Sequence, residues 1–222
     1  MSIGQPLFHD RRDAGRQLGA ALQRLGLDDP LVLALPRGGV PVAFEVAAAL
    51  GAPLDIMLVR KIGAPGYAEL GIGAVTDGHD PQTVLNEEAM AMVRPPAGYV
   101  EAESRRQRAE IERRRQAYLG GRAPADPRGR TVVLVDDGIA TGGTVKVALL
   151  ALRRSQPKTI VLAVPVAPES VLDDLRSAAD QVVCLATPEG FQAVGAHYAD
   201  FAQTTDEEVV RLLAAAREPF AA

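Results

Sequence analysis

The 222-residue sequence lacks several features that would narrow its function quickly. It has one cysteine, Cys184, which excludes an intramolecular disulfide and any zinc site built from cysteines. Its three histidines, His9, His79 and His197, do not have the spacing of metal ligands. Internal repeats and low-complexity tracts are also missing. A hydrophobic core must therefore stabilise the fold.

Long apolar runs and an excess of positive charge are missing as well. The longest apolar run, residues 160–167, is too short to cross a bilayer, and residues 1–10 do not resemble a secretory signal. The formal net charge of −4 argues against a general nucleic-acid-binding protein. Hydrophobic residues make up 47% and charged residues 23%, as in globular proteins. We expect a single-domain cytoplasmic protein that binds neither nucleic acid nor membrane.

Short apolar segments alternate along the chain with segments of helical periodicity. The predicted strands are 31–35, 54–59, 131–135, 159–166 and 181–185. The predicted helices are 10–25, 40–50, 143–154 and 168–177. This order is typical of an α/β fold with a mainly parallel sheet flanked by helices. Two shorter extended segments, 70–75 and 82–85, indicate a hairpin on the edge of that sheet.

The most informative segment is the predicted strand 132–135 with the residues that follow it. The strand leads into Asp136 and Asp137, then into a loop of small residues and a helix. Such a loop can surround one phosphate with N–H groups, and the helix adds its positive end. Paired carboxylates accept hydrogen bonds from a diol but bind phosphate poorly. The segment therefore indicates a phosphorylated sugar, and the alternative is an ordinary strand–turn–helix.

The same segment resembles the phosphoribosyl-pyrophosphate (PRPP) signature of type I phosphoribosyltransferases. The pattern is four apolar residues, two acids, two further residues and Ala-Thr-Gly-Gly-Thr at 140–144. The resemblance implies that Asp136 and Asp137 hold the ribose hydroxyls, and that they contact Mg²⁺ only through water or ligand. It also implies that 140–144 surround the 5′-phosphate. The residues expected to bind PRPP are Asp136, Asp137, Gly138, Ile139, Ala140, Thr141, Gly142, Gly143 and Thr144.

The segment Pro36-Arg37-Gly38-Gly39-Val40-Pro41 follows the first predicted strand. It resembles the pyrophosphate loop of the same family, most closely that of its xanthine–guanine members. Arg37 can bind a phosphate through two hydrogen bonds, and Gly38 and Gly39 allow the backbone to turn its N–H groups toward it. The alternative is a glycine-rich turn with an exposed arginine.

Residues 60–69 follow the second predicted strand and indicate a mobile loop. They resemble the flexible loop that closes over PRPP, where Arg-Lys-x-Gly begins the loop in adenine-type members. Closure would keep water away from the reacting ribose C1. The resemblance implies that Arg60 and Lys61 bind pyrophosphate, and that Lys61 and Arg37 act in catalysis. Glu69 is the candidate to take or orient the proton of the attacking nitrogen, or it is a solvent-exposed glutamate.

The acceptor base is not specified by these motifs. Ala140 stands where hypoxanthine–guanine enzymes carry Asp, and Ala64 stands where adenine-type loops often continue with Lys. The segment 187–201 resembles a purine-binding hood, so Phe191 is the candidate to stack on the base, or it only covers the sheet edge. The arginine-rich segment 99–118 predicts one long helix, either solvated, in a dimer contact or contacting a phosphate.

The chain as a whole resembles the bacterial group labelled only as predicted phosphoribosyltransferases. The resemblance implies a type I phosphoribosyltransferase fold over 1–222, with a helical insertion at 77–130 and a hood at 186–204. It implies transfer of the 5-phosphoribosyl group from PRPP to a nitrogenous base, a purine rather than a pyrimidine, with release of pyrophosphate. The expected cofactor is Mg²⁺, and the expected partners are PRPP, a small base or its nucleotide, and a second copy of the chain. The alternatives are a PRPP-sensing regulator and a PRPP-directed hydrolase.

Overall fold

A five-stranded parallel sheet forms the centre of the computed structural model, which describes residues 6–217. Its strand order is β2-β1-β6-β7-β8. The strands are β1 (Pro30–Ala34), β2 (Leu54–Ile56), β6 (Thr131–Val135), β7 (Thr159–Val166) and β8 (Gln181–Ala186). All five predicted strands are present, although β2 ends earlier than predicted because a new strand begins at Val59.

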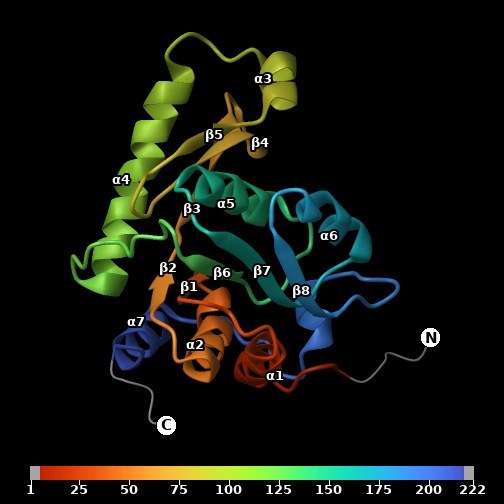
Figure 1. The fold of residues 1–222 in the computed structure, drawn as a ribbon. Coiled ribbons are helices and arrows are strands. Elements are labelled where there is room, and N and C mark those ends of the chain that lie inside the picture. The colour runs from red at the N-terminus through yellow and green to blue at the C-terminus, as the bar shows by residue number, and fades with distance from the viewer. Residues whose placement is uncertain (1–5, 218–222) are drawn as a thin grey trace.

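Helices cover both faces of this sheet (Figure 1). On one face lie α1 (Arg11–Gln23), α2 (Gly39–Leu50) and α7 (Asp206–Ala215), and on the other lie α5 (Gly143–Arg154) and α6 (Glu169–Arg176). Successive residues of β6 alternate between two buried clusters: Val133 packs under α2, whereas Leu134 packs under α5. Because both faces are covered, the strands are continuously apolar, as the sequence predicted.

Three further strands form a separate antiparallel sheet: β3 (Val59–Ala64), β4 (Tyr67–Thr76) and β5 (Thr83–Leu85). Together with α3 (Glu87–Val93) and α4 (Tyr99–Leu119) they form an arm, residues 59–119, that extends from the central sheet (Figure 1). The predicted hairpin of 70–75 and 82–85 is therefore present, but it lies in this second sheet and not on the edge of the first.

The segment 60–69, expected to be a mobile loop, is also part of the arm. It forms most of β3, a turn at 65–66 and the start of β4. The side chains of Ile62 and Ile72 are fully buried, and this burial stabilises a hairpin. The glycines and the proline of the segment predict a loop instead, because such residues are rare in strands. The expected helical insertion at 77–130 likewise contains β5 besides its two helices.

Buried ion pairs attach the arm to the central sheet. Arg115 of α4 contacts Asp77, which follows β4, at 2.6 Å and Asp55 of β2 at 3.1 Å. Arg122 adds a contact of 2.9 Å to Asp55. Burial raises the pKa of Asp77 to about 6, against the opposing effect of the Arg115 charge. These contacts fix the position of α4 relative to β2.

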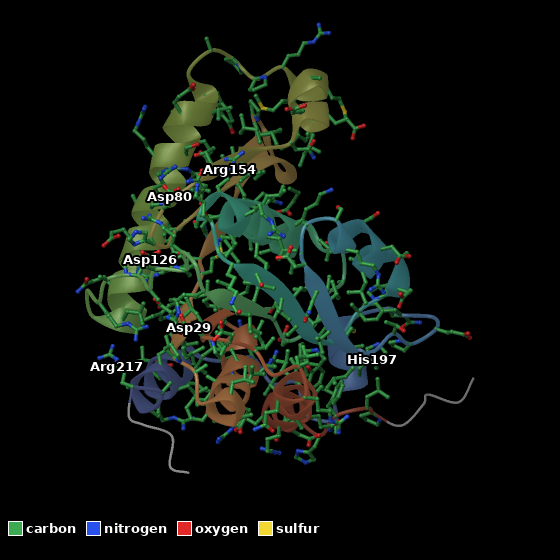
Figure 2. All side chains as sticks on the ribbon, in the orientation of Figure 1. Asp29, Asp80, Asp126, Arg154, His197 and Arg217 are labelled. Atoms are coloured by element: carbon green, nitrogen blue, oxygen red, sulfur yellow. The ribbon has the colours of Figure 1, made fainter. Side chains whose placement is uncertain are left out.

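The remaining part of the chain covers the far edge of the sheet. A short 3₁₀ helix, Val194–His197, follows β8, and Phe8 forms an isolated β-bridge with Tyr198. His197 is labelled in Figure 2 within this C-terminal region. Between residues 6 and 217, no helix has the length and apolar character needed to span a membrane.

Candidate functional site

The two adjacent carboxylates lie at the carboxyl end of β6, as predicted. Both residues are partly buried, and the Asp137 amide donates to Asp136 Oδ1 at 2.9 Å. Burial raises the pKa of both carboxyl groups; the charge of Asp137 raises that of Asp136 further, whereas Arg11 lowers that of Asp137. The two carboxyl groups therefore lie where ionisation is less favourable than in water.

The loop after these carboxylates is open to solvent where phosphate is expected to bind. Ala140, Thr141, Gly143 and Thr144 are exposed. Ile139 is buried and its amide donates to the Val166 carbonyl at 2.9 Å, which anchors the loop on β7. The first turn of α5 contains no acidic residue, so the positive end of the helix is not neutralised there. This geometry can accept a phosphate group.

The predicted pyrophosphate loop lies directly against the carboxylates. It joins β1 to α2, and β1 pairs with β6 throughout their length. A Cβ on Gly38 would overlap with the Asp137 carboxylate, and one on Gly39 would lie 2.8 Å from the Val135 carbonyl oxygen. The peptide bond between Pro36 and Arg37 is cis. Glycine is thus required because the two loops approach so closely.

Arg37 lies at this loop but turns toward α7. Its guanidinium is 3.5 Å from Asp206, which also accepts a hydrogen bond from the Tyr118 hydroxyl at 2.7 Å. A cavity of about 200 Å³ is lined by Arg37 and residues 203–207. Burial and the Asp206 carboxylate raise the pKa of Tyr118 to about 12. The sequence pointed to Arg37 but not to Asp206, which looks like an ordinary acidic residue in a first helical turn.

The arm brings Lys61 to the same region as the phosphate loop. Two cavities, of about 650 and 710 Å³, are each lined by both Lys61 and Thr144. Lys61 Nζ donates to the Glu69 carbonyl at 2.8 Å and lies 3.2 Å from its carboxylate. Arg60 instead contacts Gln107 of α4 at 2.9 Å. The side chains of Lys61 and Arg37 therefore contact different partners, Glu69 on the arm and Asp206 on α7.

Phe191 lies in the hood among aromatic and aliphatic side chains. Its ring stacks on His197 with centroids 5.1 Å apart, and it packs beside Val194 and Tyr198. A Cβ on Gly138 would lie 2.5 Å from Val194, so the predicted hood contacts the start of the predicted PRPP loop. The structure thus places Phe191 in the same segment as Val194, which contacts Gly138.

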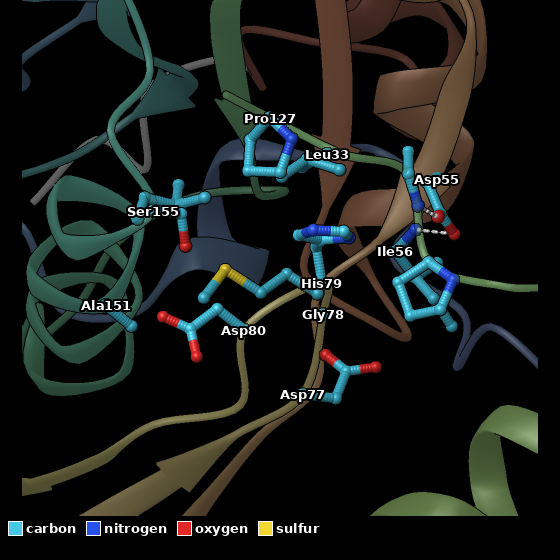
Figure 3. A pocket seen from close by; sticks show the side chains of 14 residues that line it. Leu33, Asp55, Ile56, Asp77, Gly78, His79, Asp80, Pro127, Ala151 and Ser155 are labelled. Atoms are coloured by element: carbon cyan, nitrogen blue, oxygen red, sulfur yellow. Dashed lines mark hydrogen bonds between the residues drawn. The ribbon is translucent and has the colours of Figure 1, made fainter. Parts of the chain in front are cut away.

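A different cavity lies outside this region, where the arm meets the sheet (Figure 3). It encloses only about 20 Å³, and Asp55, Asp77, His79 and Asp80 are among the residues that line it. Asp55 accepts hydrogen bonds from the amides of Ile56 and Ala125 at 2.8 Å each. These contacts occupy its carboxylate, and the cavity is too small for a substrate.

Comparison with known sequences decides the family. Residues 12–199 match the phosphoribosyl transferase domain family. The chain belongs to this family. A Mycobacterium tuberculosis H37Rv protein, Rv0571c, which has a provisional name as a phosphoribosyl transferase, is 47% identical over 215 residues. The match covers 97% of the chain and 48% of that protein, so the chain spans about half the length of the curated relatives it matches.

The phosphoribosyl transferase domain is also similar to a solved structure. The protein TT1426 from Thermus thermophilus is 47% identical and superposes with a TM-score of 0.81. The match covers 93% of this chain and 97% of TT1426. The prediction of an α/β, type I phosphoribosyltransferase fold with a mostly parallel sheet flanked by helices is confirmed.

One contact at the candidate site was not expected from the sequence. Arg11, in the first turn of α1, donates from Nε to Asp137 Oδ2 at 2.7 Å. No spacing or motif links these two residues, which are 126 positions apart. The β-bridge between Phe8 and Tyr198, together with backbone hydrogen bonds from Ala199 to Phe8 and from Asp200 to His9, brings the N-terminal segment to residues 197–202 and places Arg11 there. Residues around 8–11 are thus part of the candidate site.

Proposed function

We propose that this domain transfers the 5-phosphoribosyl group from PRPP to a nitrogenous base, a purine rather than a pyrimidine, and releases pyrophosphate. The observation that carries the proposal is the close approach of the loops after β1 and β6, which places Gly38 and Gly39 against the two carboxylates. Ligands of parallel α/β sheets bind at this end of the strands. Family membership supports a PRPP-dependent transferase in general.

PRPP would bind through three groups of atoms. The backbone N–H groups of 140–144 and the positive end of α5 would bind the 5′-phosphate. Asp136 and Asp137 would accept hydrogen bonds from the ribose hydroxyls. The backbone at Gly38 and Gly39 would face the pyrophosphate, because these glycines lie beside the carboxylates. The sugar would thus lie between the two phosphate-binding loops.

Most of the rate enhancement would come from stabilising charge on the departing pyrophosphate. Arg37 and Lys61 are the cations proposed for this role, with Arg60 in support. Arg37 would leave Asp206 and bind the ligand, and Lys61 would likewise leave Glu69 and bind the ligand. Both pairs are partly exposed, so each would be weak enough to break when pyrophosphate offers a stronger charge.

Members of the family generally use Mg²⁺ with PRPP. The described residues contain no cluster of three or more His, Cys, Asp or Glu side chains able to hold a metal ion. Two adjacent carboxylates nevertheless fit an ion that keeps several waters and binds mainly to its ligand's oxygens. Asp136 and Asp137 would hold Mg²⁺ through water or ligand, and the ion would supply positive charge beside the pyrophosphate.

The attacking base would enter between the arm and the hood. Phe191 would stack on it, although this requires His197 to leave one face of the ring. The released Glu69 carboxylate would take or orient the proton of the attacking nitrogen. Closure of the hairpin that carries Lys61 would exclude water from the ribose C1.

Pyrophosphate release tests this proposal. The purified protein is mixed with PRPP and Mg²⁺, and release is followed with a panel of free purines and pyrimidines and without base. We expect release that depends on one base, which would also identify the acceptor. Release without any base would identify a hydrolase. Binding of PRPP in calorimetry without any release would identify a regulator instead.

A further inference from the structure

Asp137 is held in place from several directions before any ligand binds. Arg11 Nε donates to its carboxylate at 2.7 Å, and the Tyr198 hydroxyl donates to its backbone carbonyl at 2.5 Å. The close approach of Gly38 limits movement on a further side. Its side chain is 15% exposed, so it remains partly accessible to a ligand.

Arg11 is itself fixed by the hood. Its Nη1 donates to the Ala202 carbonyl at 2.7 Å, and its guanidinium lies 3.8 Å above the centre of the Phe201 ring. Phe201 contacts Tyr198, with ring centroids 4.9 Å apart. Tyr198 in turn contacts Phe8. One continuous set of contacts therefore links the N-terminal segment, the hood and the carboxylate.

We propose that Arg11 is a positioning residue for PRPP binding, which orients the Asp137 carboxylate toward the ribose and couples that orientation to hood residues 198–202. The inference rests on the proposed function, because it takes Asp137 as a ligand for the ribose. A guanidinium suits the role, since its rigid fork binds the carboxylate and the Ala202 carbonyl at once. Arg11 Nε contacts only Oδ2, so the carboxylate retains lone pairs for a hydroxyl.

Arg12 provides a matched control within the same helix. It also forms an ion pair, but its partner is Glu45 of α2, at 2.5 Å, and not a carboxylate of the proposed site. Arg12→Ala therefore removes a neighbouring arginine and an ion pair without changing that site. We expect its dissociation constant for PRPP to stay within about twofold of wild type, as for a surface pair.

A double-mutant cycle measured by calorimetry with PRPP and Mg²⁺ tests the inference. Arg11→Ala should weaken binding about tenfold or more, because it removes a charged hydrogen bond to a partly buried carboxylate. In an Asp137→Asn background, the same change should have less than about a twofold further effect. Arg11→Lys should restore part of the affinity, because it returns the charge without the fork.

Each other outcome is informative. If Arg11→Ala binds PRPP as tightly as or more tightly than wild type while Asp137→Asn binds weakly, Arg11 does not position the carboxylate and the inference is wrong. Full additivity of the two changes would also overturn it. If Asp137→Asn binds PRPP as tightly as wild type, Asp137 is not a ligand for the ribose, and the proposed function fails together with this inference. Should Arg11→Ala fold poorly, Phe201→Leu keeps the ion pair and should weaken binding by a smaller factor.

Discussion

The charged residues of the candidate site all have protein partners in the described structure. Arg37 pairs with Asp206, Lys61 with Glu69 and Asp137 with Arg11. The first two pairs include well-exposed groups, whereas the third is largely buried. In the proposed complex a ligand would therefore replace Asp206 and Glu69 at little cost, whereas the contact with Arg11 should persist.

Gly38 permits the closest contact in the site, and its replacement is a sharp test of the geometry. In Gly38→Ala the new methyl group would overlap with the Asp137 carboxylate, so one of the two must move. We expect at least about a tenfold loss of PRPP affinity with about 1–3 kcal/mol lower stability. Calorimetry and urea unfolding measure the two quantities.

Gly26→Ala is the control for that change. Gly26 lies far along the chain from the site, has a φ of 58° and has open space around its Cβ position. Alanine there costs stability through the strained backbone, by about 1 kcal/mol, without reaching the carboxylates. Equal PRPP affinities for Gly38→Ala and Gly26→Ala would mean that Asp137 does not contact the ligand.

At the scale of elements, the sequence predicted the central sheet better than the arm. Strands such as 131–135 are buried on both faces, so their apolar runs are unambiguous. The glycines and the proline of segment 60–69 predict a loop, whereas burial of Ile62 stabilises a strand there. Local composition does not report such tertiary burial.

Part of the candidate site could be predicted, because some of its residues lie in loops that directly follow predicted strands. Asp136, Asp137 and Arg37 could be placed because each follows a predicted strand of a parallel sheet. Arg11 and Asp206 could not, because they reach the site through contacts over long sequence separations. Such contacts depend on the position of α1 and α7, and no short motif specifies them.

The attachment of α4 to the sheet depends on a buried guanidinium. Arg115→Met should remove the guanidinium partner of Asp77 and leave Asp55 with Arg122 alone. It should lower the free energy of unfolding by about 3–5 kcal/mol, because the buried Asp77 carboxylate loses its counter-charge. Urea unfolding measures the loss. Arg113→Met is the matched control, since Arg113 pairs with Glu110 on the exposed face of the same helix. A loss below about 1 kcal/mol for Arg115→Met would show that the ion pairs do not attach the arm.

At the scale of the whole molecule, the site combines three parts of the chain. In the proposed site the central sheet would supply the two carboxylates and the phosphate-binding loops, the arm would supply Lys61, and the segment after β8 would supply Phe191. A homodimer and a cytoplasmic location stay predictions.

The most direct test of this account is the affinity of the protein for PRPP with Mg²⁺, measured by calorimetry on wild type and Asp137→Asn. The account predicts binding to wild type and at least about a tenfold loss in the variant, because a charged acceptor for the ribose hydroxyls is removed. Thermal unfolding of both proteins should confirm that the variant is folded. No binding to wild type, or equal affinity for the two proteins, would contradict the account.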